Sequence, residues 1–224
     1  MTERTVGVHR FGREQHPIAV VDDFAADPDA LRAAAAAAAF GPAGHYYPGI
    51  RAPLPPGYFA ANADLISQLL RDLFDLPDGA RVLDASFSIV TTSPEALAAE
   101  QRMPHVDAFD AGRIALVHYL SPGDTDGTAF FRHRATGFES IDSVRSRTYL
   151  PVLNAELAAS GAPAPGYIAA DSPLFEHLGT VPARYNRAIL YRSAMLHSGA
   201  ITPGRPLPAD AATGRLTVTG FLAG

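Results

Sequence analysis

The sequence predicts a mainly β fold, a double-stranded β-helix or jelly roll, with N-terminal helices packed on one of its sheets. Two observations predict it. Segments with helical apolar spacing come early in the chain, whereas short strands separated by turns dominate the later part. Those strands carry polar residues at their ends, as in double-sheet architectures. The 224 residues, 47% of them apolar, are enough for a single packed domain over residues 1–224.

The first part of the chain predicts one strand and one helix. Residues 18–24, IAVVDDF, are apolar and partly β-branched, which favours a strand. Asp27 and Pro28 are typical of a helix start, with Asp27 as the N-cap and Pro28 at the first helical position. The alanine-rich run that follows has high helix propensity and ends at a Gly-Pro pair, so we expect a helix over residues 28–40.

The next segments predict a loop, a second helix and a second strand. Residues 45–51, HYYPGIR, are followed by several prolines and are expected to form an ordered loop. Apolar residues recur at helical spacing over residues 60–75. Residues 81–92 alternate between apolar and polar residues and are rich in Val, Ile, Phe and Thr, which favours a strand.

The rest of the chain predicts mostly strands. Residues 114–120 and 128–133 are expected to be strands joined by a turn over residues 121–127, SPGDTDG. The last strands are expected at residues 187–192 and 216–222. Between these strands we expect a partly helical stretch at residues 140–158, a loop at residues 161–166 and a short helix at residues 171–178, capped by Asp171 or Ser172 with Pro173 just inside it.

The composition excludes several classes of function. The net charge is -5 and the pI about 5.9, and no stretch is rich in Lys and Arg, so neither nucleic acid nor an anionic membrane is an expected partner. There are no cysteines, which rules out disulfides, zinc-thiolate sites, iron–sulfur clusters and thiol nucleophiles. The first residues have no apolar segment typical of a signal peptide, and the Ala-rich run is too short to span a bilayer, so we expect a cytoplasmic protein.

One motif pair predicts a metal site. His105 and Asp107 lie two residues apart just before the strand at 114–120, and side chains two apart on an extended segment point the same way. His197 follows an apolar segment and lies where a strand would end, which suits a third ligand. Two imidazoles and one carboxylate can form the facial triad of a non-haem Fe(II) oxygenase, which leaves three metal positions open. The competing histidines are His118, His133 and His177.

A second motif predicts an anion site. Arg215 opens the last strand, and Thr217, two residues on, lies on the same face. An Arg fork binds a carboxylate through two hydrogen bonds, and a neighbouring hydroxyl can add one more. This pair could therefore hold the far carboxylate of a co-substrate such as 2-oxoglutarate.

Taken together, these motifs resemble the 2-oxoglutarate/Fe(II)-dependent dioxygenases, in their prolyl-hydroxylase-like branch, and are similar to a bacterial subfamily of it. Tyr119-Leu120, a Gly/Asp turn and Gly127-Thr128-x-Phe130 add to the resemblance, which spans roughly residues 85–222. It implies a cupin-like single dioxygenase domain. The implied Fe(II) ligands are His105, Asp107 and His197, and the implied 2-oxoglutarate contacts are Arg215, Thr217 and Tyr119.

The predicted substrate contacts come from two segments. Tyr46, Tyr47 and Arg51 could form a lid over the metal, and Arg132 and His133 could line the opposite wall. Such residues suit a small amphipathic or anionic molecule or a peptide side chain, so we expect hydroxylation of an amino acid, a peptide residue or a related small metabolite. The sequence carries no signal for an oligomeric state.

Two other functions remain open at this point. A zinc-dependent hydrolase or isomerase would use the same three ligands but would not need Arg215. A non-catalytic jelly-roll binding protein would keep the scaffold without the reaction. Metal content and turnover that depends on 2-oxoglutarate separate these possibilities.

Overall fold

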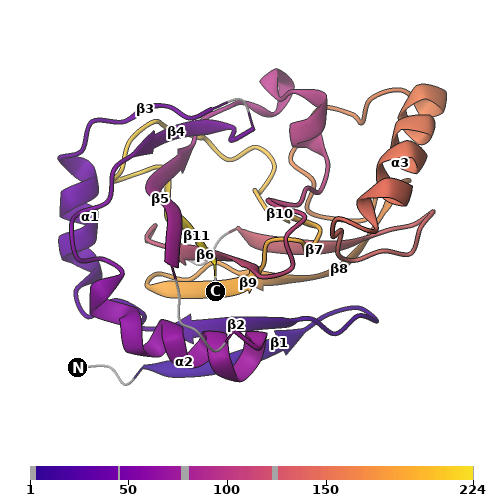
Figure 1. Cartoon of the computed structure of the whole chain (residues 1–224). Helices are drawn as coiled ribbons and strands as arrows, with labels where there is room; N and C mark the ends of the chain where they lie inside the picture. Colours follow the sequence, from indigo (N-terminus) through magenta and orange to yellow (C-terminus); the bar gives the residue numbers. More distant parts are fainter. Residues whose placement is uncertain (1–3, 45, 77–80, 123–125, 224) are drawn as a thin grey trace.

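Two antiparallel sheets face each other in the computed structural model of the chain, and three α-helices pack on their outer sides (Figure 1). The structure describes residues 4–44, 46–76, 81–122 and 126–223, and all statements on the fold refer to these. The mainly β prediction is confirmed. The predicted turn at residues 121–127 and the predicted loop at residues 45–51 lie partly outside the described residues.

The larger sheet has eight described strands in the order β1-β2-β9-β6-β11-β5-β4-β3, and the smaller has three in the order β10-β7-β8. The strands are β1 Thr5–Arg10, β2 Pro17–Asp22, β3 Gly41–Pro42, β4 Gly49–Ala52, β5 Arg81–Val90, β6 Arg113–Tyr119, β7 Gly127–His133, β8 Phe175–Pro182, β9 Arg187–Arg192, β10 His197–Gly199 and β11 Arg215–Ala223. The helices are α1 Pro28–Ala36, α2 Ala63–Phe74 and α3 Ser146–Ser160, with 3-10 turns η1 Ala60–Asn62, η2 Pro94–Ala96 and η3 Ala99–Arg102.

Helices α1 and α2 cover the outer face of the larger sheet. The Asp27 side chain accepts a hydrogen bond from Ala30 N, 2.9 Å away, so the predicted N-cap is confirmed. The apolar side of α2, with Leu70 and Phe74 fully buried, packs with Phe87 of β5 in the main core. The spacing seen in the sequence therefore gives the helix its buried face.

A second core joins the two sheets. Phe130 of β7 and Val181 of β8 pack against Tyr119, Ile189 and Tyr191 of the larger sheet. Helix α3 lies outside the smaller sheet, where its Tyr149 packs with the buried side chains of Phe131 and Phe175. Figure 1 shows α3 on the side of the molecule opposite to α1. The inner faces of the two sheets therefore enclose the middle of the molecule.

Several predicted boundaries differ from the structure. Helix α1 ends at Ala36 rather than at residue 40, because Phe40 packs on the main core as the chain turns into β3. Within the predicted loop, Gly49–Ala52 is strand β4, paired with β5. Strand β1 was not predicted, since every residue in it is exposed at the sheet edge and no buried face marks it.

The predicted helix over residues 171–178 is wrong. Phe175–Pro182 is the edge strand β8, which pairs with β7 and buries Phe175 in the core under α3. The capping signal was real but local, because the Ser172 hydroxyl accepts a hydrogen bond from Phe175 N, 3.0 Å away, within a turn. Pairing with β7, a partner distant in sequence, decided the conformation of the residues that follow.

The described helices include none that is both long and apolar enough to cross a membrane.

Candidate metal and co-substrate site

The backbone brings the first and last histidines of the motifs together. His105 N donates to His197 O over 2.9 Å, and His197 N donates to His105 O over 3.0 Å, which forms an isolated antiparallel bridge beside β10. Asp107 N donates to Ser193 O over 2.9 Å. The segment that carries His105 and Asp107 is therefore fixed along the chain that leads from β9 to β10.

Three side chains converge at this bridge. One possible ligand atom from each of His105, Asp107 and His197 lies within 4.8 Å of the others. Asp107 Oδ1 is 3.7 Å from His105 Nε2, and Asp107 Oδ2 is 3.4 Å from His197 Nε2. The arrangement is a compact set of two imidazoles and one carboxylate with the size of a single-ion site. His118, His133 and His177 are not part of this cluster.

A backbone carbonyl sets the tautomer of His197. Its Nδ1 lies 2.9 Å from Met195 O, and a carbonyl can only accept, so Nδ1 carries the proton in the neutral ring. Nε2 then presents its lone pair to Asp107. Metal-binding histidines are commonly held in this way, through a hydrogen bond from the second ring nitrogen to a carbonyl.

The electrostatics keep His105 neutral. Enclosure by the protein and the neighbouring ring of His197 lower the pKa of His105 to about 4, and Asp107 opposes this shift. The side chain of His105 is 53% exposed, but it lines the central cavity, so its exposed part faces cavity space within the protein. A neutral imidazole is the form that binds a metal ion.

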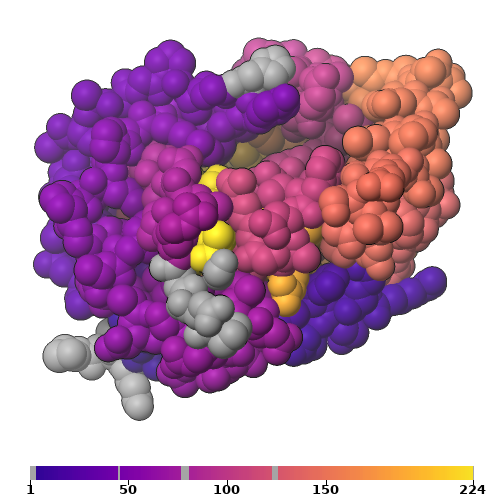
Figure 2. All heavy atoms as spheres, viewed as in Figure 1, coloured from indigo at the N-terminus to yellow at the C-terminus, as the bar shows by residue number. Residues whose placement is uncertain are grey.

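The triad opens into a cavity of about 610 Å³ between the two sheets. Figure 2 shows a hollow between the violet N-terminal part and the magenta segment of the chain. Besides the triad, the cavity wall includes residues from both sheets, residues 44 and 46–48 of the segment before β4, and residues 100 and 101 of η3. Those on the inner face of the larger sheet are Arg51, Val90, Arg113, Ala115, Val117, Tyr191, Arg215, Thr217, Thr219 and Phe221.

Arg215 lines this cavity from the start of β11. Its Nη2 donates to Gly127 O over 3.0 Å, and its Nε lies 3.8 Å from Asp126 Oδ2. Nε is buried and has no hydrogen-bond partner. Asp126 is held by Thr202 and Arg205 of the segment that precedes β11. The guanidinium therefore has a fixed place but an unsatisfied donor.

Thr217 and Tyr119 flank Arg215 in the sheet. They are direct partners in the β11–β6 register, and the ring centroid of Tyr119 lies 6.0 Å from the guanidinium carbon of Arg215. Thr217 Oγ1 donates to Ser88 O over 3.3 Å and lines the cavity. The hydroxyl of Tyr119 is hydrogen-bonded to Thr128 Oγ1 over 2.7 Å, and Tyr119 is not among the cavity-lining residues.

The three residues predicted to form a lid lie near Arg215 in the cavity. Tyr46, Tyr47 and Arg51 line it, and the guanidinium carbon of Arg51 is 4.6 Å from the ring centroid of Tyr47. The hydroxyl of Tyr47 is buried and lies close to the hydroxyls of Ser88 and Thr217. Burial raises the pKa of this phenol, while the nearby charges of Arg215 and Arg51 oppose the rise. Tyr47 therefore lies near Arg215, a proximity that the sequence did not indicate.

The placement of Arg132 and His133 at the cavity wall is wrong. Arg132 forms ion pairs with Glu139 and with Glu176, 2.6 Å from the latter, and is buried. His133 is fully buried and hydrogen-bonded to Glu156 of α3 over 2.8 Å. The alternation of β7 puts His133 on the outer face with Phe131, where its ring lies against Tyr149 and Phe175 under α3. Arg132 is held by its two glutamate partners instead, so neither side chain lines the cavity.

Tyr191 and Arg113 are among the cavity residues that sequence reasoning missed. Tyr191 of β9 lines the cavity, and its ring centroid is 4.9 Å from that of His197. Arg113, at the start of β6, also lines it. Tyr191 lies in the strand predicted at residues 187–192, whereas Arg113 comes one residue before the strand predicted at 114–120. Even with the alternation of both strands known, only the sheet order shows which face lines the cavity.

Comparison with known proteins gives one family match. The model of a family described as "Family of unknown function (DUF6445)" matches residues 2–222. No curated protein matches the chain.

Two crystal structures of proteins from streptomycetes are among the similar folds. HygX from Streptomyces hygroscopicus, with nickel, 2-oxoglutarate and hygromycin B bound, is 16% identical with a TM-score of 0.49, over 92% of this chain and 82% of that one. AviO1 from Streptomyces viridochromogenes Tue57 is 12% identical with a TM-score of 0.45, over 91% and 87%. At these identities and TM-scores the likeness does not extend to function.

Proposed function

The chain belongs to the DUF6445 family of unknown function, and we propose that it is a non-haem Fe(II)- and 2-oxoglutarate-dependent dioxygenase. One observation carries the proposal. The triad of His105, Asp107 and His197 opens into the same cavity as a buried arginine with an unsatisfied donor. A metal site alone would not require that arginine.

The donor set fits Fe(II). Two neutral imidazoles and one carboxylate are the ligands of the facial triad, which leaves three positions for other molecules. The lone pair of His197 Nε2 faces the carboxylate of Asp107 at 3.4 Å, and a cation between them would relieve that repulsion. Fe(II) bound there would supply the redox chemistry with oxygen that side chains lack.

The co-substrate end of the cavity fits a carboxylate. Arg215 Nε is a buried donor without a hydrogen-bond partner. The buried hydroxyl of Tyr47 lies beside Thr217 of β11, and both residues line the cavity. An unsatisfied buried donor such as Arg215 Nε is costly, so an acceptor is expected in the complete site. We assign Arg215, with Tyr47 and Thr217, to the 5-carboxylate of 2-oxoglutarate. Tyr119 supports the guanidinium through its ring rather than through its hydroxyl.

The same proposal includes the finer architecture. The two facing sheets correspond to a double-stranded β-helix, and residues 1–224 form one dioxygenase-like domain. The larger sheet supplies Arg215 and Thr217, and β10 of the smaller sheet supplies His197. The outcome of the reaction is hydroxylation of an amino acid, a peptide residue or a related small metabolite.

Binding measurements on variants test the assignment. Ni(II) and 2-oxoglutarate are titrated calorimetrically into the wild type and into His197→Ala, Arg215→Lys, Tyr47→Phe and His177→Ala. We expect His197→Ala to weaken Ni(II) binding by about 100-fold or more, as loss of one of three ligands implies. Arg215→Lys and Tyr47→Phe should weaken the binding of 2-oxoglutarate and leave the binding of Ni(II) unchanged. His177→Ala is the control, because His177 lies outside the triad.

Three results would contradict the proposal. Tight Ni(II) binding with no 2-oxoglutarate binding would favour a zinc-type hydrolase or isomerase. Absence of both would favour a binding protein without this chemistry. Equal loss of both ligands in Arg215→Lys would show that Arg215 maintains the fold of the site. Succinate formation with Fe(II), oxygen and a substrate panel then tests turnover itself.

A further inference from the structure

The central cavity holds a cation that the proposed site does not use. Arg113 opens β6 and lines the cavity together with Ala115 and Val117, since alternate residues of a strand share one face. The guanidinium carbon of Arg113 lies 4.3 Å from the ring centroid of Phe221. Stacking of this kind uses the flat face of the guanidinium and leaves its N–H edge available to an anion.

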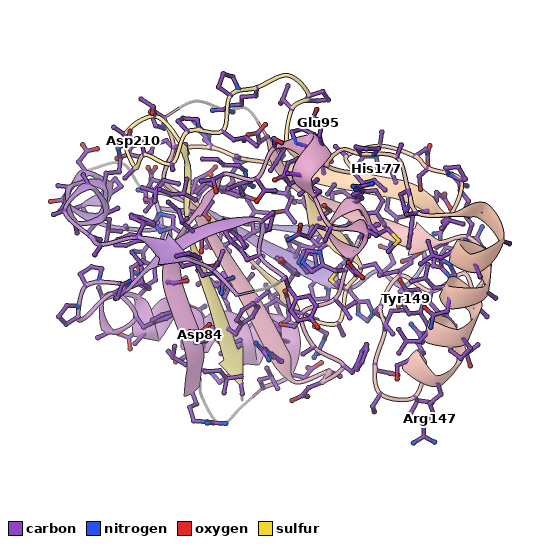
Figure 3. All side chains as sticks on the ribbon, turned by 90° about the horizontal axis from the view of Figure 1, so that it is seen from above. Asp84, Glu95, Arg147, Tyr149, His177 and Asp210 are labelled. Carbon is purple, nitrogen blue, oxygen red and sulfur yellow. The ribbon has the colours of Figure 1, made fainter. Side chains whose placement is uncertain are left out.

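Arg113 differs from the other cavity arginines in its charge environment. Arg215 has Asp126 at 3.8 Å, and Arg51 has Asp84 at 4.0 Å. Figure 3 shows Asp84 on β5, away from α3. Arg113 forms no ion pair or side-chain hydrogen bond within the described ranges, and its Nε is buried. A partly buried cation without a counter-charge is unfavourable, so a ligand anion would complete the site.

The two ends of β11 separate Arg113 from the co-substrate arginine. Arg113 pairs with Ala223 at the end of β11, whereas Arg215 begins the strand and pairs with Val90 of β5. Eight residue steps at ~3.3 Å each put about 26 Å of strand between the two backbone positions. One small carboxylate cannot be held by both side chains, so each would take a different anion.

The backbone ties Arg113 to the triad. Ser193 N donates to Arg113 O over 2.8 Å, and Asp107 N donates to Ser193 O over 2.9 Å. Ala115, the next inward residue of β6, pairs with Tyr191, whose ring contacts that of His197. The guanidinium of Arg113 therefore occupies a fixed position relative to the three proposed ligands, with apolar side chains between.

We propose that Arg113 is the residue that binds the substrate, through a carboxylate or a phosphate, and that the substrate is a small acid with an apolar body. This inference rests on the proposed function. Ala115, Val117 and Phe221 provide an apolar wall for that body, and the volume of about 610 Å³ suits a small molecule together with a co-substrate. The planar fork of Arg113 matches a carboxylate best.

Ligand-observed NMR titrations with benzoate, phenyl phosphate and benzamide test the inference. They are run on the wild type, Arg113→Gln, Arg113→Lys and Arg147→Gln, once with Ni(II) and saturating 2-oxoglutarate and once with neither. In the titrations with saturating 2-oxoglutarate, the co-substrate occupies Arg215, so the added anion cannot bind there. Benzamide has nearly the shape of benzoate without its charge. Arg147 lies on α3 and points away from the protein in Figure 3, so its variant removes one positive charge far from the cavity.

We expect at least one of the two anions to bind the wild type more tightly than benzamide does. Arg113→Gln should lower the affinity for that anion by about 10- to 100-fold, the range for a lost charged hydrogen bond. The affinity for benzamide should stay unchanged. Arg113→Lys should keep part of the affinity, which shows that the strand still folds. Arg147→Gln should match the wild type.

Equal anion affinity in Arg113→Gln and the wild type would overturn the inference, as would anions that bind no better than benzamide. The ligand-free arm separates this failure from failure of the proposed function. If the protein does not bind Ni(II) but Arg113→Gln still lowers the affinity for the anion in the titrations without Ni(II) and 2-oxoglutarate, the anion site is supported and the dioxygenase assignment is wrong.

Discussion

At position 49 the backbone leaves no room for a side chain. A Cβ on Gly49 would lie 2.0 Å from Ile89 O and 2.9 Å from Ile89 C, both backbone atoms of β5. Gly49 directly follows Tyr47 and Pro48, which line the cavity, and Pro48 O accepts hydrogen bonds from Thr91 N and Thr92 N. This one glycine therefore allows the lid segment to lie against the sheet.

Gly49→Ala should destabilise the protein by about 1–3 kcal/mol, as overpacking against a rigid neighbour does. Gly41→Ala, in the paired strand β3, is the matched control, because nothing lies within 4 Å of a Cβ there. Urea unfolding of both variants measures the difference. Equal stability of the two variants would mean that β4 can move away from β5 at little cost.

At the scale of elements, a partly buried carboxylate joins the β1–β2 hairpin to the segment before α3. Glu14 accepts hydrogen bonds from Arg145 Nη1 at 2.7 Å, Ser140 Oγ at 2.6 Å and Glu139 N at 3.1 Å, and it also pairs with His16. Partial burial raises the pKa of Glu14, but these hydrogen bonds outweigh it and lower the pKa from 4.5 to about 2.

A lowered carboxyl pKa stabilises the folded state only while the group is ionised. This contribution should be complete above about pH 4.5 and lost as the pH falls through about 2. At ~1.4 kcal/mol per pKa unit it amounts to at most about 3 kcal/mol. Glu14→Gln should therefore be less stable than the wild type at pH 7, and the gap should narrow between pH 4.5 and 2.

Chemical unfolding at a series of pH values measures this gap. Glu95→Gln is the control, since Glu95 is exposed in η2 and is seen at the surface in Figure 3. A gap that stays constant down to pH 2 would contradict the ionic role of Glu14 and favour one of packing.

At the scale of the whole molecule, the proposed ligands would connect the two sheets. His197 belongs to the smaller sheet and Arg215 to the larger, and the cavity between them accepts both ligands under the proposal. A ligand that binds only the folded state stabilises it in proportion to the logarithm of its concentration.

Ni(II) with 2-oxoglutarate, at about 100 times its dissociation constant, should add about 2.7 kcal/mol to stability and raise the Tm by about 5–10 °C. Differential scanning calorimetry measures the shift. His197→Ala should lose most of it, because the metal then has two ligands. An equal shift in His197→Ala would place the metal elsewhere on the protein.

The sequence by itself determined the local features of this protein. The Asp27 cap, the amphipathic pattern of α2 and the bounds of β9 are set by neighbouring residues, and each was predicted. The His-x-Asp pair, His197 and Arg215 were also found from sequence, because their chemistry depends on residue type and on spacing along an extended segment.

Only the tertiary structure decided which side chains meet. Strand β8 forms because β7 offers it a partner, which overrides a local capping signal. His133 lies on the outer face of β7 under α3 and Arg132 is held by two glutamates, whereas Arg113, Tyr47 and Tyr191 face the cavity. Sheet order and register depend on contacts between residues far apart in the chain, so no local pattern in the sequence could fix them.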